Sequence, residues 1–223
     1  MTEAELKEFL ENCPKLYHMA EQGSWPSIRE RGLLSTSAIL DLYGVVGQER
    51  EKIEDQRRPA GVTVQKTGLP DAIIRDQIPM SDKALRKCLL NNLQPRDWYR
   101  LLNSKVFFWV SKKRLLRLLA AKAYRNKTHD ILELDSGRLV QELARDIWLC
   151  PINSGSTIMN PRPRGMSTFA RIQDYPYDEW RSRRGKTERV VELSVDYSVP
   201  NVREFVTRVV EMRGGKISKT LPI

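Results

Sequence analysis

Hydrophobic and polar positions along this chain follow two periods, a pattern typical of mixed helices and strands. Apolar residues spaced three and four apart predict amphipathic helices, and short β-branched or aromatic runs predict strands. The predicted helices cover residues 2–12, 26–31, 38–46, 82–91, 95–102, 112–122, 138–143 and 202–212. The predicted strands cover residues 16–19, 62–64, 106–110, 131–134, 147–150 and 189–195.

Capping residues support several of these boundaries. Thr2, Ser35 and Ser111 precede predicted helices, and each has a hydroxyl that can accept a hydrogen bond from a free N–H of the first turn. Pro26 opens a short helix and Gly32 ends it, which is the usual order of these two residues.

Three segments lack regular periodicity. Residues 47–79 are charged and irregular around the short strand at 62–64, and residues 151–165 form a long polar loop of the kind that often binds ligands. Residues 216–223 are predicted to be a loose tail. Because nothing resembles a linker, we expect a single α+β domain over residues 1–223, with its core in 14–212.

The net charge of +10, with a pI of about 9.6, favours polyanionic partners such as nucleic acid. A basic surface formed only of solvated helix faces is the alternative. The basic residues gather in three groups: Lys112, Lys113, Arg114, Arg117, Lys122, Arg125 and Lys127; Arg162 and Arg164; and Arg181, Arg183, Arg184 and Lys186.

Composition excludes several classes of protein. No apolar run approaches the roughly 20 residues that span a bilayer, and the N-terminal residues are acidic, without a signal peptide. We therefore expect a cytoplasmic protein that does not enter the membrane. The three cysteines, Cys13, Cys88 and Cys150, are scattered, so neither a disulfide framework nor a metal site is expected. Dinucleotide-fold, P-loop and zincin motifs are also missing from the sequence.

Two residues are candidates for chemistry. His18 ends a predicted strand just before a polar turn, where it either contacts a ligand or packs beside its aromatic neighbour. Glu192 lies among valines in the strand at 189–195, where it is either an exposed edge residue or a buried functional acid. Glu188 is a competing acid four residues earlier.

The sequence around His18 resembles the opening motif of DarT-type ADP-ribosyltransferases. The likeness rests on Tyr17-His18-Met19, on Ser24-Trp25 six residues after the histidine, and on Ile28 and Gly32-Leu33. A second match is the segment 192–195 before Val199-Pro200, which resembles the strand with the catalytic glutamate of that family and favours Glu192 over Glu188. An uncharacterised bacterial set with the same opening and the loop 151–157 is more similar still, over residues 14–212.

The resemblance implies an ADP-ribosyltransferase-like fold of small packed antiparallel sheets flanked by helices, and NAD as co-substrate. It implies that Glu192 is catalytic and that a nucleic-acid base is one class of acceptor. The residues expected to bind NAD are Tyr17, His18, Met19, Ser24, Trp25, Arg57, Arg58 and Phe108. The residues expected to contact the acceptor are Asn153, Ser154, Ser156, Arg183 and Arg184.

The chemistry suits these residue types. Cleavage of the nicotinamide–ribose bond passes through an oxocarbenium-like state, as glycoside hydrolysis does, and a carboxylate stabilises that charge. Arginine pairs with a pyrophosphate.

The chain also departs from the family. Ala20 replaces a threonine hydroxyl of the opening motif, and residues 111–114 replace an Arg-Ser-Pro-Met segment. The alternative function is therefore a catalytically silent nucleic-acid-binding module with the same fold, and an antitoxin or regulatory partner is left open. Transfer of a 2′-phosphate from RNA to NAD is a third possibility, although its basic constellation is not evident.

Overall fold

The computed structural model describes residues 1–159 and 161–223. Its helices are α1 (Glu3–Asn12), α2 (Trp25–Arg31), α3 (Thr36–Tyr43), α4 (Gly47–Glu54), α5 (Asp82–Cys88), α6 (Pro95–Asn103), α7 (Lys112–Leu119), α8 (Ser136–Leu143) and α9 (Tyr177–Arg181). Its strands are β1 (Lys15–Glu21), β2 (Leu33–Leu34), β3 (Val62–Val64), β4 (Ala72–Ile74), β5 (Lys105–Trp109), β6 (Thr128–Asp135), β7 (Ile147–Cys150), β8 (Ala170–Arg171), β9 (Glu192–Asp196), β10 (Ser198–Val199), β11 (Val206–Arg213) and β12 (Lys216–Leu221).

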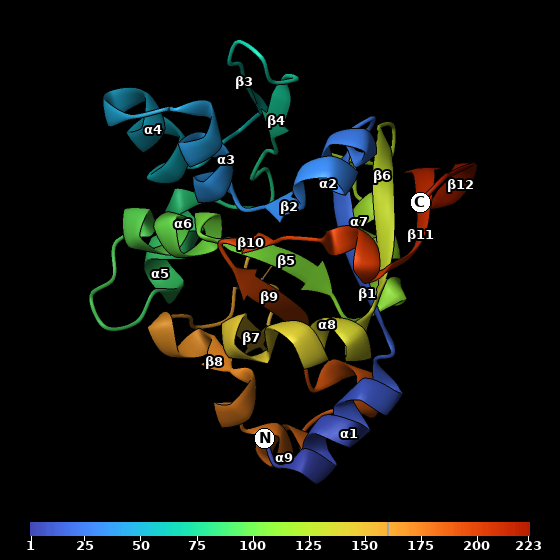
Figure 1. Ribbon diagram of the computed structural model, residues 1–223. Coiled ribbons are helices and arrows are strands. Elements are labelled where there is room, and N and C mark those ends of the chain that lie inside the picture. The colour runs from blue at the N-terminus through green and yellow to red at the C-terminus, as the bar shows by residue number, and fades with distance from the viewer. Residues whose placement is uncertain (160) are drawn as a thin grey trace.

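The strands form antiparallel sheets within a mixed α+β fold. The main sheet of the described residues has eight strands in the order β12-β11-β6-β1-β5-β9-β7-β8, and two small sheets pair β2 with β10 and β3 with β4. In Figure 1, α3, α4, β3 and β4 lie at one end of the molecule, and α1 with α9 lies at the other. The α+β class is confirmed, although the main sheet is larger than the small sheets expected.

The main sheet has few paired residues at its centre, between β1 and β5. Among the described residues, β1 pairs with β6 at seven positions and β5 pairs with β9 at five, but β1 and β5 share the single pair Tyr17 and Trp109. Past that pair the two strands diverge. The backbone groups of residues 18–20 therefore do not reach those of residues 105–108. Other groups must fill the space between the two strands.

Both faces of the sheet are covered. The larger apolar cluster lies on one face and includes Leu16, Phe108 and Leu193, with α1, α2 and α8 packed over it. On the opposite face, Leu115 and Leu119 of α7 pack against the strands β1, β6 and β11. Because both faces are covered, the central strands are buried along most of their length, including polar residues such as His129, Asp130 and Glu192.

The predicted caps agree with the structure at two of three helices. Thr2 makes a reciprocal capping box with Glu5, and the hydroxyl of Ser35 accepts a hydrogen bond from the backbone N–H of Ala38. Ser111 occupies the N-cap position of α7 but makes no side-chain capping bond.

The predicted C-terminal helix at 202–212 is wrong. A short 3₁₀ turn at 202–204 leads into β11, which pairs with β6 along its length. The valines that suggested a helical face are β-branched, and an available neighbouring strand decides the outcome for such residues.

The predicted loose tail at 216–223 is also wrong. Residues 216–221 form β12 at the edge of the sheet, and Leu221 packs against the core. The carbonyl of Pro222 accepts a hydrogen bond of 2.7 Å from the indole of Trp25, which joins the end of the chain to α2.

The segment at 47–79 is more regular than its composition suggested. It contains α4, and β4 pairs with the predicted strand at 62–64. Ile53, Val64 and Ile74 build a small apolar cluster with α3. In the described part of the chain, no helix is both long and apolar enough to cross a membrane.

Gly32 provides a test of this packing. A Cβ atom on Gly32 would lie 2.6 Å from the carbonyl oxygen of Val199, where β2 meets β10, and its φ of +83° already disfavours other residues. Gly23 has nearly the same φ, +81°, but open space around it. We expect Gly23→Ala to cost about 1 kcal/mol of unfolding free energy and Gly32→Ala to cost at least about 3 kcal/mol, as measured by denaturant unfolding. Equal losses for the two variants would contradict the close approach.

Candidate functional site

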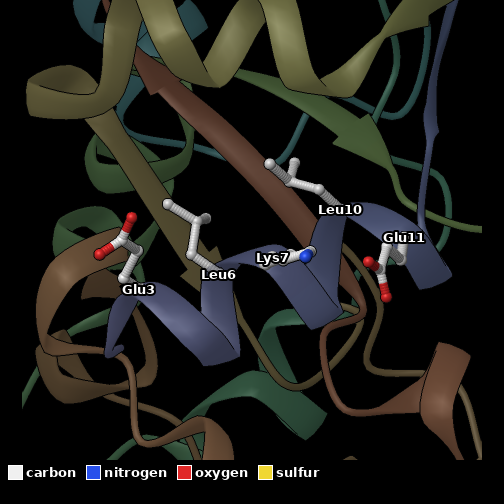
Figure 2. A pocket seen from close by; sticks show the side chains of 5 residues that line it. All are labelled: Glu3, Leu6, Lys7, Leu10 and Glu11. Carbon is white, nitrogen blue, oxygen red and sulfur yellow. The ribbon is translucent and has the colours of Figure 1, made fainter.

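The divergence of β1 and β5 opens a large cleft. Its volume is about 1160 Å³, and its walls come from β1, β5, α2, the segment 70–79 and the loop at 153–155. A second hollow, of about 440 Å³, lies along α1 and is lined by residues of that helix alone (Figure 2). Since catalysis requires polar groups that converge from several elements, the cleft is the candidate site.

Glu192 is the buried acid of this cleft. It begins β9 and is 5 % exposed, between Trp109 of β5 and Cys150 of β7 in the register of the sheet. The backbone N–H of Ser154 donates to one carboxylate oxygen at 3.1 Å, and the Ser154 hydroxyl donates to the same oxygen at 2.6 Å. Of the two alternatives left open for Glu192, the structure shows the buried one, and it brings Ser154, expected only to contact the acceptor, into direct contact with the acid.

Ser154 is itself held in place by two hydrogen bonds to its backbone carbonyl. Its carbonyl accepts hydrogen bonds from Arg164 Nη1 at 2.9 Å and from the indole of Trp98 at 3.3 Å. Arg164 is 1 % exposed and its guanidinium also lies over the Trp98 ring. The arginine that composition placed in a basic surface group is thus an internal residue that orients the loop against the glutamate.

Burial decides the acidity of Glu192. Loss of hydration raises the pKa of its carboxyl to about 7, and this effect outweighs the two hydrogen bonds from Ser154 and the charges of Arg114 and Arg164, which lower it. A carboxyl with that pKa exchanges protons near neutral pH, as a general acid or base must.

Glu188 has a different role. It lies in a 3₁₀ turn and is ion-paired with Arg114, and it is not among the described residues that line the cleft. The structure therefore places Glu192, rather than Glu188, in the cleft.

His18 lies where β1 turns away from β5. Its Nδ1 is 2.9 Å from the carbonyl oxygen of Phe107, so Nδ1 must hold the proton because a carbonyl only accepts. Burial, with a smaller contribution from the charge of Arg75, outweighs the bond to Phe107 and lowers the pKa of the imidazole to about 4. The ring is therefore neutral at pH 7, and the lone pair of Nε2 is left to accept a hydrogen bond in the cleft.

Several other predicted NAD-binding residues also line the cleft. Tyr17, Met19 and Ser24 do so, and Phe108 lies with its ring 5.7 Å from that of His18. Phe108 is 1 % exposed and belongs to the main core cluster, so packing dominates its role. Asn153 lines the cleft beside Ser154.

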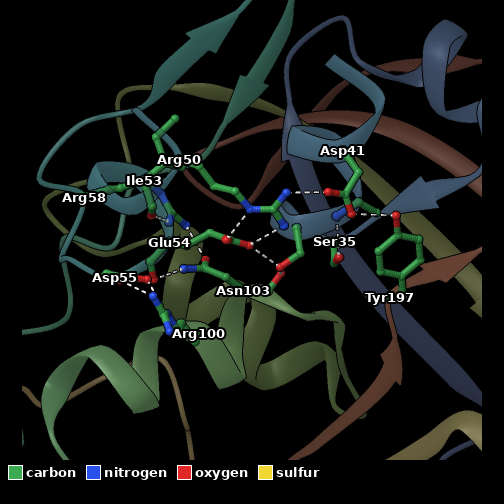
Figure 3. Close-up of polar contacts among 12 residues, drawn as sticks. Ser35, Asp41, Arg50, Ile53, Glu54, Asp55, Arg58, Arg100, Asn103 and Tyr197 are labelled. Carbon is green, nitrogen blue, oxygen red and sulfur yellow. Dashed lines mark hydrogen bonds and ion pairs between the residues drawn. The ribbon is translucent and has the colours of Figure 1, made fainter. Parts of the chain in front are cut away.

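Arg58 lines the cleft, but its guanidinium is fully engaged. It donates to the carbonyls of Ile53 at 2.5 Å and Arg75 at 3.0 Å, and to the side-chain oxygen of Asn103 at 3.0 Å (Figure 3). Asn103 in turn donates to the carbonyl of Glu54 at 2.8 Å. This network holds α4 and α6 together, so Arg58 has a structural role, and its contact with a ligand stays a prediction.

Trp25 and Arg57 are not among the described lining residues. The indole of Trp25 is buried against the C-terminal segment, and its backbone N–H donates to Asp130 at 3.0 Å, which holds the turn after β1. Arg57 donates to the carbonyl of Ile78 at 3.2 Å. Both side chains serve the packing of the cleft walls.

Three predicted acceptor residues also lie outside the described lining. The hydroxyl of Ser156 accepts a hydrogen bond from the N–H of Ile158 within its own loop. Arg184 donates to the carbonyls of Pro151 and Glu188, and its guanidinium stacks on Trp180, as does that of Arg183. Arg184 therefore secures the base of the loop, and its contact with an acceptor stays a prediction.

Sequence reasoning missed other lining residues. Arg75 donates to Glu21 and to the carbonyl of Met19, and it lies over the ring of Tyr124. Tyr124 donates to Asp76 at 2.7 Å. These residues lie outside regular periodic patterns, in a connection and in a turn, so no signal in the sequence identified them.

Three further arginines lie along the cleft. Arg29, Arg31 and Arg203 line the cleft, and Arg29 and Arg203 are exposed. Within residues 1–159 and 161–223, no group of three His, Cys, Asp or Glu side chains is arranged to hold a metal ion.

Comparison with known proteins identifies a family but no function. Residues 14–206 match the model of a family of unknown function, DUF7002. No curated protein and no solved structure matches the chain.

The contact between Ser154 and Glu192 can be tested by titration. Ser154→Ala removes the 2.6 Å hydroxyl bond, so we expect the pKa of Glu192 to rise by about one unit above its value near 7. Carbon-13 NMR of the glutamate carboxyls measures this shift. Ser156→Ala is the matched control, since Ser156 does not contact Glu192. A pKa that stays unchanged in Ser154→Ala would show that the hydroxyl does not act on the acid.

Proposed function

This chain belongs to the DUF7002 family, whose function is unknown, and we propose that it is an NAD-dependent ADP-ribosyltransferase. The observation that carries the proposal is the acid at the centre of the cleft. Glu192 is buried, has a pKa near 7 and is held by Ser154, and a neutral histidine with an unused acceptor lines the same cleft.

The reaction divides naturally between these groups. The bond between C1′ of the ribose and the nicotinamide nitrogen breaks, and its electron pair stays on the nicotinamide. Ionised Glu192 accepts a hydrogen bond from a ribose hydroxyl and stabilises the oxocarbenium-like charge. An acceptor nucleophile then attacks C1′, and its proton passes to Glu192.

The lone pair on Nε2 supports a binding role for His18. Because Nδ1–H is held by the carbonyl of Phe107, the ring cannot turn without losing that bond. Nε2 is therefore a fixed acceptor, suited to a second hydroxyl of the sugar. The volume of about 1160 Å³ exceeds that of pockets for drug-sized ligands, which suits a dinucleotide.

The phosphate partners differ from those predicted at residues 57 and 58. Arg29, Arg31 and Arg203 line the cleft and supply positive charge for a pyrophosphate. We extend the proposal to the fold. A cleft where two central antiparallel strands diverge, with His18 on one side and Glu192 two strands away, is consistent with an ADP-ribosyltransferase-like arrangement.

Glu192→Gln tests the catalytic role. We expect transfer or hydrolysis of radiolabelled NAD to fall by about 10²- to 10⁴-fold, because the amide can neither stabilise the positive charge nor take a proton. The variant should remain folded. A raised carboxyl pKa costs stability as pH rises from about 4.5 to about 7, so above pH 7 Glu192→Gln should melt no lower than the wild type.

Glu188→Gln is the control for the loss of one carboxylate, and we expect it to keep wild-type activity. Equal activity of Glu192→Gln and wild type would contradict the proposed role of Glu192. Absence of NAD binding by calorimetry would overturn the enzyme and leave the silent binding module.

His18→Asn tests the binding role separately. The asparagine amide can still donate to the carbonyl of Phe107, but it lacks the acceptor at the position of Nε2. We expect the Kd for NAD to rise about tenfold with little change in melting temperature. An unchanged Kd, or an unfolded variant, would assign His18 to packing.

A further inference from the structure

Several segments of this chain contain no acidic residue, and two of them contribute to one surface. Residues 98–129 lack Asp and Glu entirely, and so do residues 212–223. They are far apart in sequence, and each contains several lysines and arginines.

The fold brings these two segments together. α7 packs on β11 through Leu115, which belongs to the same apolar cluster as Val210 and Met212. The turn between β11 and β12 then lies against the end of α7. A Cβ atom on Gly214 would be 3.1 Å from the carbonyl oxygen of Arg125, and one on Gly215 would be 3.6 Å from a methyl of Leu116.

The result is a basic surface, defined by six exposed cations from the two segments. Lys127 lies 4.0 Å from Asp76, and none of the other five is ion-paired within the part of the chain that the structure describes. The six are Arg117, Lys122, Arg125, Lys127, Arg213 and Lys216. Like charges gathered on one surface repel each other, and a polyanion relieves that repulsion.

This surface continues into the cleft. Leu118 and Tyr124 belong to the same segment as four of the cations, and both line the cleft. Trp109, which precedes α7, also lines it and is half-buried. Aromatic and apolar side chains therefore lie at the border between the basic surface and the cleft.

We propose that this basic surface binds the sugar–phosphate backbone of a nucleic acid and directs a neighbouring base toward the cleft. The cations match phosphates, and bases can stack on an aromatic group at the cleft border, whereas an acidic peptide offers only charge. Binding at this surface does not depend on the proposed reaction, whereas the delivery of a base to the cleft rests on it.

Fluorescence anisotropy with a labelled single-stranded oligonucleotide, without NAD, tests this surface. The triple variant Lys122→Gln, Arg125→Gln and Lys216→Gln removes three of its charges. The matched control, Lys83→Gln, Arg86→Gln and Lys87→Gln, removes three exposed charges from α5, which lies well apart from β11 and β12 in Figure 1. The two triple variants have the same net charge as each other, because each loses three positive charges.

We expect the surface variant to bind at least tenfold more weakly while the α5 variant binds as the wild type does. The slope of log affinity against log salt should fall by about 2 in the surface variant, because each lost contact to a single strand removes about 0.7. Equal weakening of both variants, or none in either, would overturn the surface. Competition by polyglutamate as strong as that by unlabelled oligonucleotide would overturn its assignment to nucleic acid.

The proposed reaction and the proposed surface can be tested independently of each other. Glu192→Gln should bind the oligonucleotide as tightly as the wild type, since Glu192 lies in the cleft and not on the basic surface. Binding without any NAD turnover would support the surface and refute the reaction.

Discussion

The cleft depends on one interruption in the sheet. Backbone hydrogen bonds normally continue between neighbouring strands, because an unpaired buried N–H or C=O group is costly. Here β1 and β5 separate after the pair Tyr17 and Trp109, and the imidazole of His18 takes the carbonyl of Phe107 that a strand partner would otherwise bind. One side chain thus ends the sheet locally and also becomes a wall of the resulting cleft. A histidine suits both roles, since its second nitrogen stays available.

Support for the acid comes from layers of buried polar groups. Glu192 is held by Ser154, and Ser154 is held by Arg164 and Trp98. Each layer is buried, so each hydrogen bond acts in a medium that screens charge poorly. Arg164 therefore orients the loop at Ser154. It does so without forming a direct ion pair with Glu192. A direct pair would hold the carboxyl ionised, whereas this arrangement leaves its pKa near neutrality.

Local sequence patterns predicted much of the fold and part of the site. Periodicity identified most helices and central strands, because burial on one face or two leaves a clear spacing. It failed at residues 202–212, where valines suit a helix or a strand and pairing with β6 decided the outcome, and at residues 216–221, which pair with β11. Charge was a poorer guide, since Arg58, Arg164 and Arg184 bind backbone carbonyls inside the molecule. Spacing to a known motif located His18 and Glu192, but Arg75 and Tyr124 reach the cleft only through tertiary contacts.

The bond between Trp25 and Pro222 also bears on how the protein is made. The chain leaves the ribosome from its N-terminus, so β1 and α2 are exposed long before β11 and β12 exist. β6 pairs with β1 early, but it pairs with β11 only after that strand has been made. The indole of Trp25 in α2 likewise finds the carbonyl of Pro222 only after β12 has been made. Contacts between such distant segments form slowly. The cleft walls therefore gain their last contacts only after β11, β12 and Pro222 have been synthesised.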